Sequence, residues 1–271
     1  MLNSSSSSVK ARMSLKIDEI EYFSRDSLNS GAVYIFKRND VWQETNKVVP
    51  ANQGWNQSFG FSVAISDDGK TLAVGTPGDW SLSVGATGSP TNYVNEGDIR
   101  FESTYRFFYI VPKLNFTRDK SSYASGAVYV YKYSDTNSSW AQEGYIKASN
   151  PRTALQFGQS LSLSGNGDVL AVGCYQESSL ASGINGDQLD TSSLNSGASY
   201  VFKRSASVWT QQSYVKAPNS DAEDRFSRTL ILDFTGDILA IGAHRESSNA
   251  EGVNGSRTDN SKTAAGAVYI Y

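Results

Sequence analysis

The sequence predicts an all-β protein built from repeated four-stranded antiparallel sheets. Its 271 residues include 23 Gly, 15 Tyr and 12 Phe, a composition typical of chains with many turns and aromatic strands. A Gly-Ala-Val/Ser-Tyr motif occurs four times, beginning at Gly31, Gly126, Gly197 and Gly266. A block of constant length also recurs along the chain. Such repetition indicates a fold that uses one supersecondary unit several times.

The constant block runs from a Trp to the Gly of a Leu-Ala-Val/Ile-Gly motif. In one copy it contains Trp140, Asn150, Phe157 and Gly173, and the Gly lies 33 positions after the Trp. Two further copies keep this spacing without a gap, at Trp42, Asn52, Phe59 and Gly75 and at Trp209, Asn219, Phe226 and Gly242. Because insertions collect in surface loops, we interpret the ungapped block as the scaffold.

Each unit contains four candidate strands. In one unit they cover residues 157–164, 168–174, 197–204 and 208–217. The turn between the first two is "SGNGD", and its equivalents are "SDDGK" and "DFTGD". Asn-Gly or Asp-Gly between apolar runs is a strong hairpin signal, so we expect antiparallel pairing.

The four strands differ in the surfaces that they should bury. The Gly-Ala-Val-Tyr strands are apolar at consecutive positions, which indicates burial on both faces. The Leu-Ala-Val-Gly strands are also two-sided but small, which suits crowding near an axis, whereas the longer and more polar Trp strand should lie outside. Such sheets are typical of β-propeller blades. The predicted core is Leu72, Val74, Leu170, Val172, Leu239, Ile241, Tyr34, Tyr129, Tyr200 and Tyr269.

These motifs resemble the FG-GAP repeat, a family whose best-known members form the propeller head of integrin α subunits. The resemblance is carried by "FGFSVAISDDGKTLAVGTP" (59–77) and "FGQSLSLSGNGDVLAVGCY" (157–175). A looser copy, "FSRTLILDFTGDILAIGAH" (226–244), has Ser227 in place of the Gly. The resemblance implies a propeller and an extracellular or cell-surface location.

The repeat register predicts about three to four blades, fewer than most propellers need to close a ring, which typically has 4–8. We therefore expect a segment of a larger propeller whose remaining blades come from missing parts of the parent chain. The predicted domains are a loop and incomplete blade start at 1–29 and FG-GAP repeats at 30–271. These repeats divide into a partial blade at 30–52, a blade at 53–150 with an insertion at 80–118, a blade at 151–219 and a partial blade at 220–271.

Composition excludes several classes of function. The formal net charge of −3 does not suggest binding to nucleic acid or to a membrane surface. No apolar run approaches the roughly 18–20 residues that span a bilayer. Cys174 is the single cysteine, so an internal disulfide and a thiolate metal cluster are both excluded. The start of the chain has no apolar segment of signal-peptide type, so we expect either a cytosolic protein or a missing N-terminal part.

Calcium is the one cofactor that the long loops suggest. Each loop that follows a Leu-Ala-Val-Gly motif carries an acid near each end, with Asn or Asp between. The candidate ligands are Glu177, Asp187 and Asp190 in one loop and Glu246, Asn254 and Asp259 in the next. The alternative, which we favour, is that these side chains cap backbone N–H groups. The turns that hold the family's calcium loop are too short here to supply its 6–8 oxygen ligands.

The insertion suggests a partner site. Residues 101–116 are aromatic, and Phe107, Phe108 and Tyr109 continue without a polar interruption. Exposed, they would form an interaction patch. Alternatively, they form an extra strand pair packed on the blade edge.

No residue pattern indicates catalysis. His244 is the only histidine and has no candidate nucleophile near it in the sequence, and Cys174 is expected to be a small buried residue. We therefore predict a non-enzymatic binding or adhesion module with a protein or glycan ligand. The alternatives are a structural segment of a large secreted protein and an enzyme that acts on polysaccharides from a propeller scaffold.

Overall fold

The computed structural model describes residues 29–54, 56–81, 83–86 and 123–271. This part of the chain is all-β and contains no helix, and therefore none that could cross a membrane. The N-terminal segment, most of the insertion and the proposed partner residues Phe107, Phe108 and Tyr109 lie outside the described residues.

The strands form four antiparallel sheets, each a simple meander in sequence order. The first sheet is β1 (Val33–Arg38) and β2 (Trp42–Val48). The second is β3 (Ser62–Ile65), β4 (Thr71–Thr76), β5 (Ala127–Ser134) and β6 (Ser139–Ile146). The third is β7 (Ser160–Leu163), β8 (Val169–Cys174), β9 (Ala198–Ser205) and β10 (Val208–Val215). The fourth is β11 (Phe226–Leu232), β12 (Leu239–Ala243) and β13 (Ala267–Ile270).

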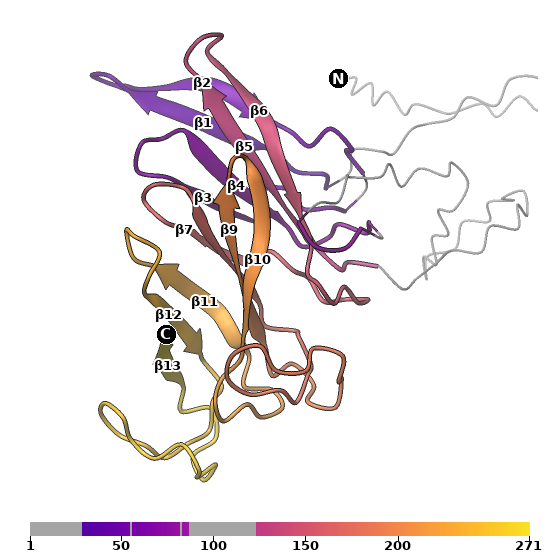
Figure 1. The fold of residues 1–271 in the computed structure, drawn as a ribbon, viewed down its shortest axis with the longest axis vertical. Coiled ribbons are helices and arrows are strands. Elements are labelled where there is room, and N and C mark those ends of the chain that lie inside the picture. The colour runs from indigo at the N-terminus through magenta and orange to yellow at the C-terminus, as the bar shows by residue number, and fades with distance from the viewer. Residues whose placement is uncertain (1–28, 55, 82, 87–122) are drawn as a thin grey trace, which may run out of the picture.

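The sheets stack face to face along the molecule, from β1 and β2 at one end to β13 at the other (Figure 1). The first strand of each sheet makes most of the contacts between sheets: β7 lies against β3 and β4, and β11 against β7, β8 and β9. The Leu-Ala-Val-Gly strand is the second strand of the second, third and fourth sheets, next to this edge. The predicted propeller blades are confirmed, with the Trp strand at the outer edge.

Burial follows the stacking. Every residue of β4 is buried, as are the first five of β5, because these central strands have a sheet on each side. All the predicted core residues are buried except Tyr34, which is 51% exposed. That prediction was wrong because Tyr34 lies in the end sheet, where β1 pairs only with β2 among the described strands. The equivalent Tyr129 and Tyr200 are fully covered.

A backbone joint that only glycine permits connects each sheet to the next. Gly126 has a φ of +84°, and a Cβ there would lie 2.2 Å from the carbonyl oxygen of Phe157. At the same place, the Phe157 N–H donates a 3.0 Å hydrogen bond to the Ser125 carbonyl. The same joint recurs between Gly31 and Phe59 and between Gly197 and Phe226. The Gly-Ala-Val-Tyr motif repeats because each sheet needs this contact with the following one.

Leu170 provides the stability test for this core. It is fully buried in β8 and belongs to the apolar cluster between the second and third sheets. We expect Leu170→Ala to lower the free energy of unfolding by about 2–5 kcal/mol, through lost transfer free energy and the cavity left behind. Urea unfolding measures this, with the 82% exposed Leu189→Ala as the matched control. An unchanged midpoint for Leu170→Ala would contradict the blade assignment.

Candidate functional site

The loop after each Leu-Ala-Val-Gly strand turns inward and buries one carboxylate. These are Asp79, Glu177 and Glu246, which are at most 1% exposed. The carbonyl of each acid also accepts a hydrogen bond from the N–H of the glycine that begins the next Gly-Ala-Val/Ser-Tyr motif. Glu177 and Glu246, two of the acids that the sequence suggested as ligands, therefore lie inside the blades.

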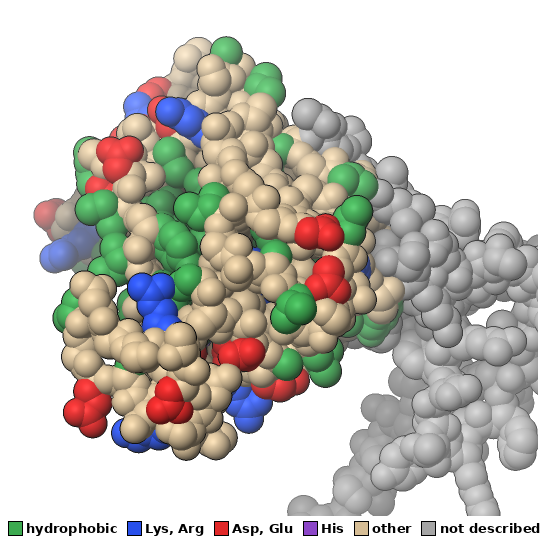
Figure 2. Space-filling model, turned by 60° about the horizontal axis from the view of Figure 1, so that its bottom comes forward, with side chains coloured by type: hydrophobic (Ala, Val, Ile, Leu, Met, Phe, Trp, Pro, Cys, Tyr) green, Lys and Arg blue, Asp and Glu red, His purple; other side chains and the backbone are tan. Residues whose placement is uncertain are grey.

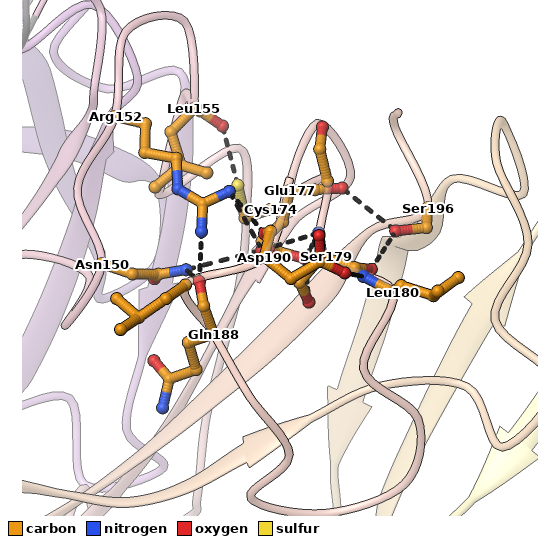
Figure 3. Close-up of polar contacts among 12 residues, drawn as sticks. Asn150, Arg152, Leu155, Cys174, Glu177, Ser179, Leu180, Gln188, Asp190 and Ser196 are labelled. Carbon is orange, nitrogen blue, oxygen red and sulfur yellow. Dashed lines mark hydrogen bonds and ion pairs between the residues drawn. The ribbon is translucent and has the colours of Figure 1, made fainter. Parts of the chain in front are cut away.

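Glu177 lies at the centre of a closed polar cluster in the third sheet (Figure 3). The Lys216 ammonium donates to its carboxylate at 2.9 Å and to the Ser196 hydroxyl at 2.6 Å. The Ser179 N–H donates to both carboxylate oxygens, at 3.1 and 3.0 Å. The Asn150 amide lies 3.4 Å away. Burial lowers the pKa of Lys216, and the charge of Glu177 opposes that shift. The Glu177 carboxylate is thus already paired with a cation of the protein itself.

Asp79 forms the equivalent cluster in the second sheet with a side chain one methylene shorter. The Lys147 ammonium donates to it at 3.1 Å, and both partners are fully buried. The Tyr145 hydroxyl also donates to this carboxylate at 2.8 Å, and the Tyr129 hydroxyl lies 3.1 Å from it and 2.7 Å from the Asn52 amide oxygen. In the third sheet the equivalent Tyr200 likewise donates to an asparagine, Asn150. Each cluster thus binds the loop to the end of its own Trp strand.

Glu246 occupies this position in the fourth sheet, whose three described strands do not include the segment that carries the lysine in the second and third sheets. Its oxygens accept hydrogen bonds from the Asn219 amide and the Ser248 hydroxyl, each at 2.9 Å. Among the residues that the structure describes, no lysine or arginine lies within ion-pair distance of this carboxylate. Nearby, burial raises the pKa of Asp224 to about 6, and the Asp221 and Glu246 charges add to that rise.

The remaining predicted calcium ligands cap backbone groups. Asp190 accepts hydrogen bonds from the N–H groups of Leu180 and Ser192, both at 2.9 Å, which lower its pKa. Asp187 accepts from the Leu189 N–H, and Asp259 from the Ser261 N–H. Asn254 lies in its loop with a φ of +58°. The described residues contain no group of three or more His, Cys, Asp or Glu that could hold a metal. The geometry supports the capping alternative, and calcium stays a prediction.

The single cysteine belongs to the core. Cys174 is fully buried, its thiol donates to the Leu155 carbonyl at 2.7 Å, and burial raises its pKa. A thiol in this state is a poor nucleophile.

His244 lies among three arginines that sequence reasoning missed. The exposed imidazole has a pKa lowered by burial and by the charges of Arg225, Arg228 and Arg245. The Arg228 and Arg225 guanidinium carbons lie 5.0 and 5.7 Å from the Tyr175 ring centroid. The sequence did contain a signal for this cluster, because all three arginines lie at repeat positions that have other residue types in the other units.

Comparison with known proteins supports the repeat assignment. Residues 42–94 match the family model described as the FG-GAP repeat. This confirms the resemblance that the motifs suggested, across part of the chain. No curated protein matches the chain.

The buried ion pair makes a stability prediction. Lys216→Met leaves Glu177 buried without its cation, so we expect a loss of about 3–5 kcal/mol in the free energy of unfolding. The double variant Lys216→Met/Glu177→Gln should recover part of that loss because no buried charge remains. Urea unfolding compares them, with the exposed Lys203→Met as control. Equal stability of Lys216→Met and the wild type would show that the pair does not support the fold.

The effect of calcium on the melting temperature distinguishes loop acids that cap backbone groups from loop acids that bind a metal. If the acids only cap backbone groups, we expect the same melting temperature in calcium and in a chelator. Asp190→Ala should then lower it equally in both, because two N–H groups lose their acceptor. Calcium-dependent stabilisation of the wild type that disappears in Asp190→Ala would instead support a metal site. Differential scanning fluorimetry gives the readout.

Proposed function

We propose that residues 30–271 form a non-enzymatic binding module of an extracellular or cell-surface protein, which presents its loops to a protein or glycan partner. The observation that carries this proposal is the FG-GAP match on a scaffold of stacked propeller blades. The positions of the loop acids in the structure agree with a non-enzymatic module. Asp79 and Glu177 are buried against lysines, and Asp190 caps its loop, so none of them is placed to attack a substrate.

The end faces support a larger propeller. A Cβ on Gly266 would meet nothing closer than 3.5 Å, although the same position in the other units contacts the next blade at 2.0–2.2 Å. In the same strand, Val268 and Ile270 are 71% and 75% exposed. Phe61, just before β3, and Val63 and Ile65 on β3 are also exposed, because the first sheet contributes only β1 and β2 among the described strands. Hydrophobic side chains also gather on one side of the surface in Figure 2. We propose that further blades of the parent protein cover these faces.

The alternatives differ in what they predict for a ligand. A structural repeat segment needs no ligand beyond its neighbouring blades. A polysaccharide-acting enzyme needs exposed acids or a Tyr, Arg and His set at a substrate cleft. His244, Tyr175 and the arginines form the nearest approach to such a set, but the exposed imidazole lies among cations rather than beside an orienting carboxylate.

Binding and turnover assayed together test this function. The purified chain is presented to immobilised polysaccharides and extracellular-matrix proteins, while the chain length of each soluble polysaccharide is followed by size-exclusion chromatography. We expect saturable binding to at least one member and no shortening of any polysaccharide. Shortening would establish an enzyme. Failure to bind every member would favour the structural segment.

A further inference from the structure

Two sets of three polar side chains occupy the same repeat positions in neighbouring units. The positions are one residue before the conserved Phe, two after it, and three after the Leu-Ala-Val/Ile-Gly glycine. The third sheet carries glutamines there and the fourth carries arginines, whereas the unit of the second sheet has Ser58, Phe61 and Gly78. The two sets are Gln156, Gln159 and Gln176, and Arg225, Arg228 and Arg245.

The glutamine set is a small hydrogen-bonded cluster with an unused acceptor. The Gln159 amide nitrogen donates to the side-chain oxygens of Gln156 and of Gln176, the latter at 3.3 Å. Gln159 is 6% exposed, and its own side-chain oxygen has no hydrogen-bond partner among the described residues. This oxygen is itself inaccessible, so a ligand hydroxyl would meet the half-buried amides of Gln156 and Gln176, which Gln159 holds in place.

The arginine set has more positive charge than its surroundings neutralise. The Glu223 carboxylate accepts from Arg225 at 3.2 Å and from Arg245 at 3.4 Å. Arg228 is exposed and has no hydrogen bond or ion pair among the described side chains, and its guanidinium lies over the Tyr175 ring. Two guanidiniums therefore share one carboxylate, and the third, Arg228, has no carboxylate partner among the described residues. This excess of like charge favours an anionic ligand.

Tyr175 makes the two sets continuous. It belongs to the third sheet's unit, directly precedes Gln176 and lies under Arg225 and Arg228 of the next unit. The negative face of an aromatic ring attracts a cation, so Tyr175 helps to hold these two guanidiniums beside the glutamine set. The result is a run of amides followed by guanidiniums across the boundary between two blades.

We propose that this amide–guanidinium surface binds an acidic polysaccharide. Guanidinium forks bind carboxylate or sulfate groups through two parallel hydrogen bonds, and amides both donate to and accept from hydroxyls. A polysaccharide chain with uronate or sulfate groups presents anions and hydroxyls on adjacent sugars, which matches the adjacent sets. An acidic peptide offers carboxylates but no matching series of hydroxyls. This inference rests on the proposed binding function and names its ligand class.

The test uses a substitution that the chain itself supplies. Arg228→Gln installs the residue that stands at this position in the neighbouring unit, and it lies on the surface. Lys203→Gln removes the same charge from an exposed position on β9. Calorimetric titration compares both variants and the wild type against polygalacturonate, chondroitin sulfate, neutral dextran and poly-glutamate. Because a hydrogen bond to a charged group is lost, we expect Arg228→Gln to weaken binding to one of the acidic polysaccharides about tenfold.

The outcomes separate this inference from the binding function itself. Lys203→Gln should stay within about twofold of the wild type if binding is local rather than due to net charge. Equal affinity of Arg228→Gln and the wild type, an equal loss in both variants, or tighter binding to poly-glutamate would overturn the proposal. If the wild type binds only dextran or a protein, the proposed binding function is supported and the proposed site for an acidic polysaccharide is contradicted. If the wild type binds no ligand in either experiment, both proposals are contradicted.

Discussion

The structure depends on one backbone contact between sheets. At each boundary, a glycine with positive φ lies against the carbonyl of the following Phe, so closely that a Cβ would collide with it. The contact fixes where each sheet begins relative to the previous one. The Leu-Ala-Val-Gly glycines reinforce it, since a Cβ on Gly75 would lie 2.1 Å from the Gly158 carbonyl oxygen. With both contacts repeated and the connecting block constant in length, successive sheets take up the same arrangement.

Inside the second and third sheets, a buried ion pair fixes which segments meet. Lys216 follows β10, Glu177 lies in the loop after β8, and Ser196 precedes β9, so one ammonium group connects three segments. Removing two charges from water is costly, and such a pair adds little net stability compared with apolar side chains of the same size. The pair instead favours one position of the loop, because any displaced loop would leave one of the two charges buried without its partner.

Comparison of the repeat units distinguishes residues that maintain the fold from residues that are available for recognition. The joint glycines Gly126 and Gly197 and the loop acids recur between units and are buried within the fold. The positions around Tyr175 differ between units, and Arg228 and Arg245 at these positions are exposed. A repeat scaffold keeps its stacking contacts constant and varies what it exposes, so recognition is found in the differences between copies.

The sequence by itself determined the strands, their order and most of the core. Those features repeat with constant spacing. They depend on apolar runs, turn residues and glycines that are close together in the sequence of each unit. It did not determine that Tyr34 would be exposed, that Lys216 would bind Glu177, or that Arg228 would cover Tyr175. Each of these depends on a neighbour tens of residues away or in another sheet. Burial, charge pairing and ring contacts are set by what packs against a side chain, and only the tertiary structure decides that.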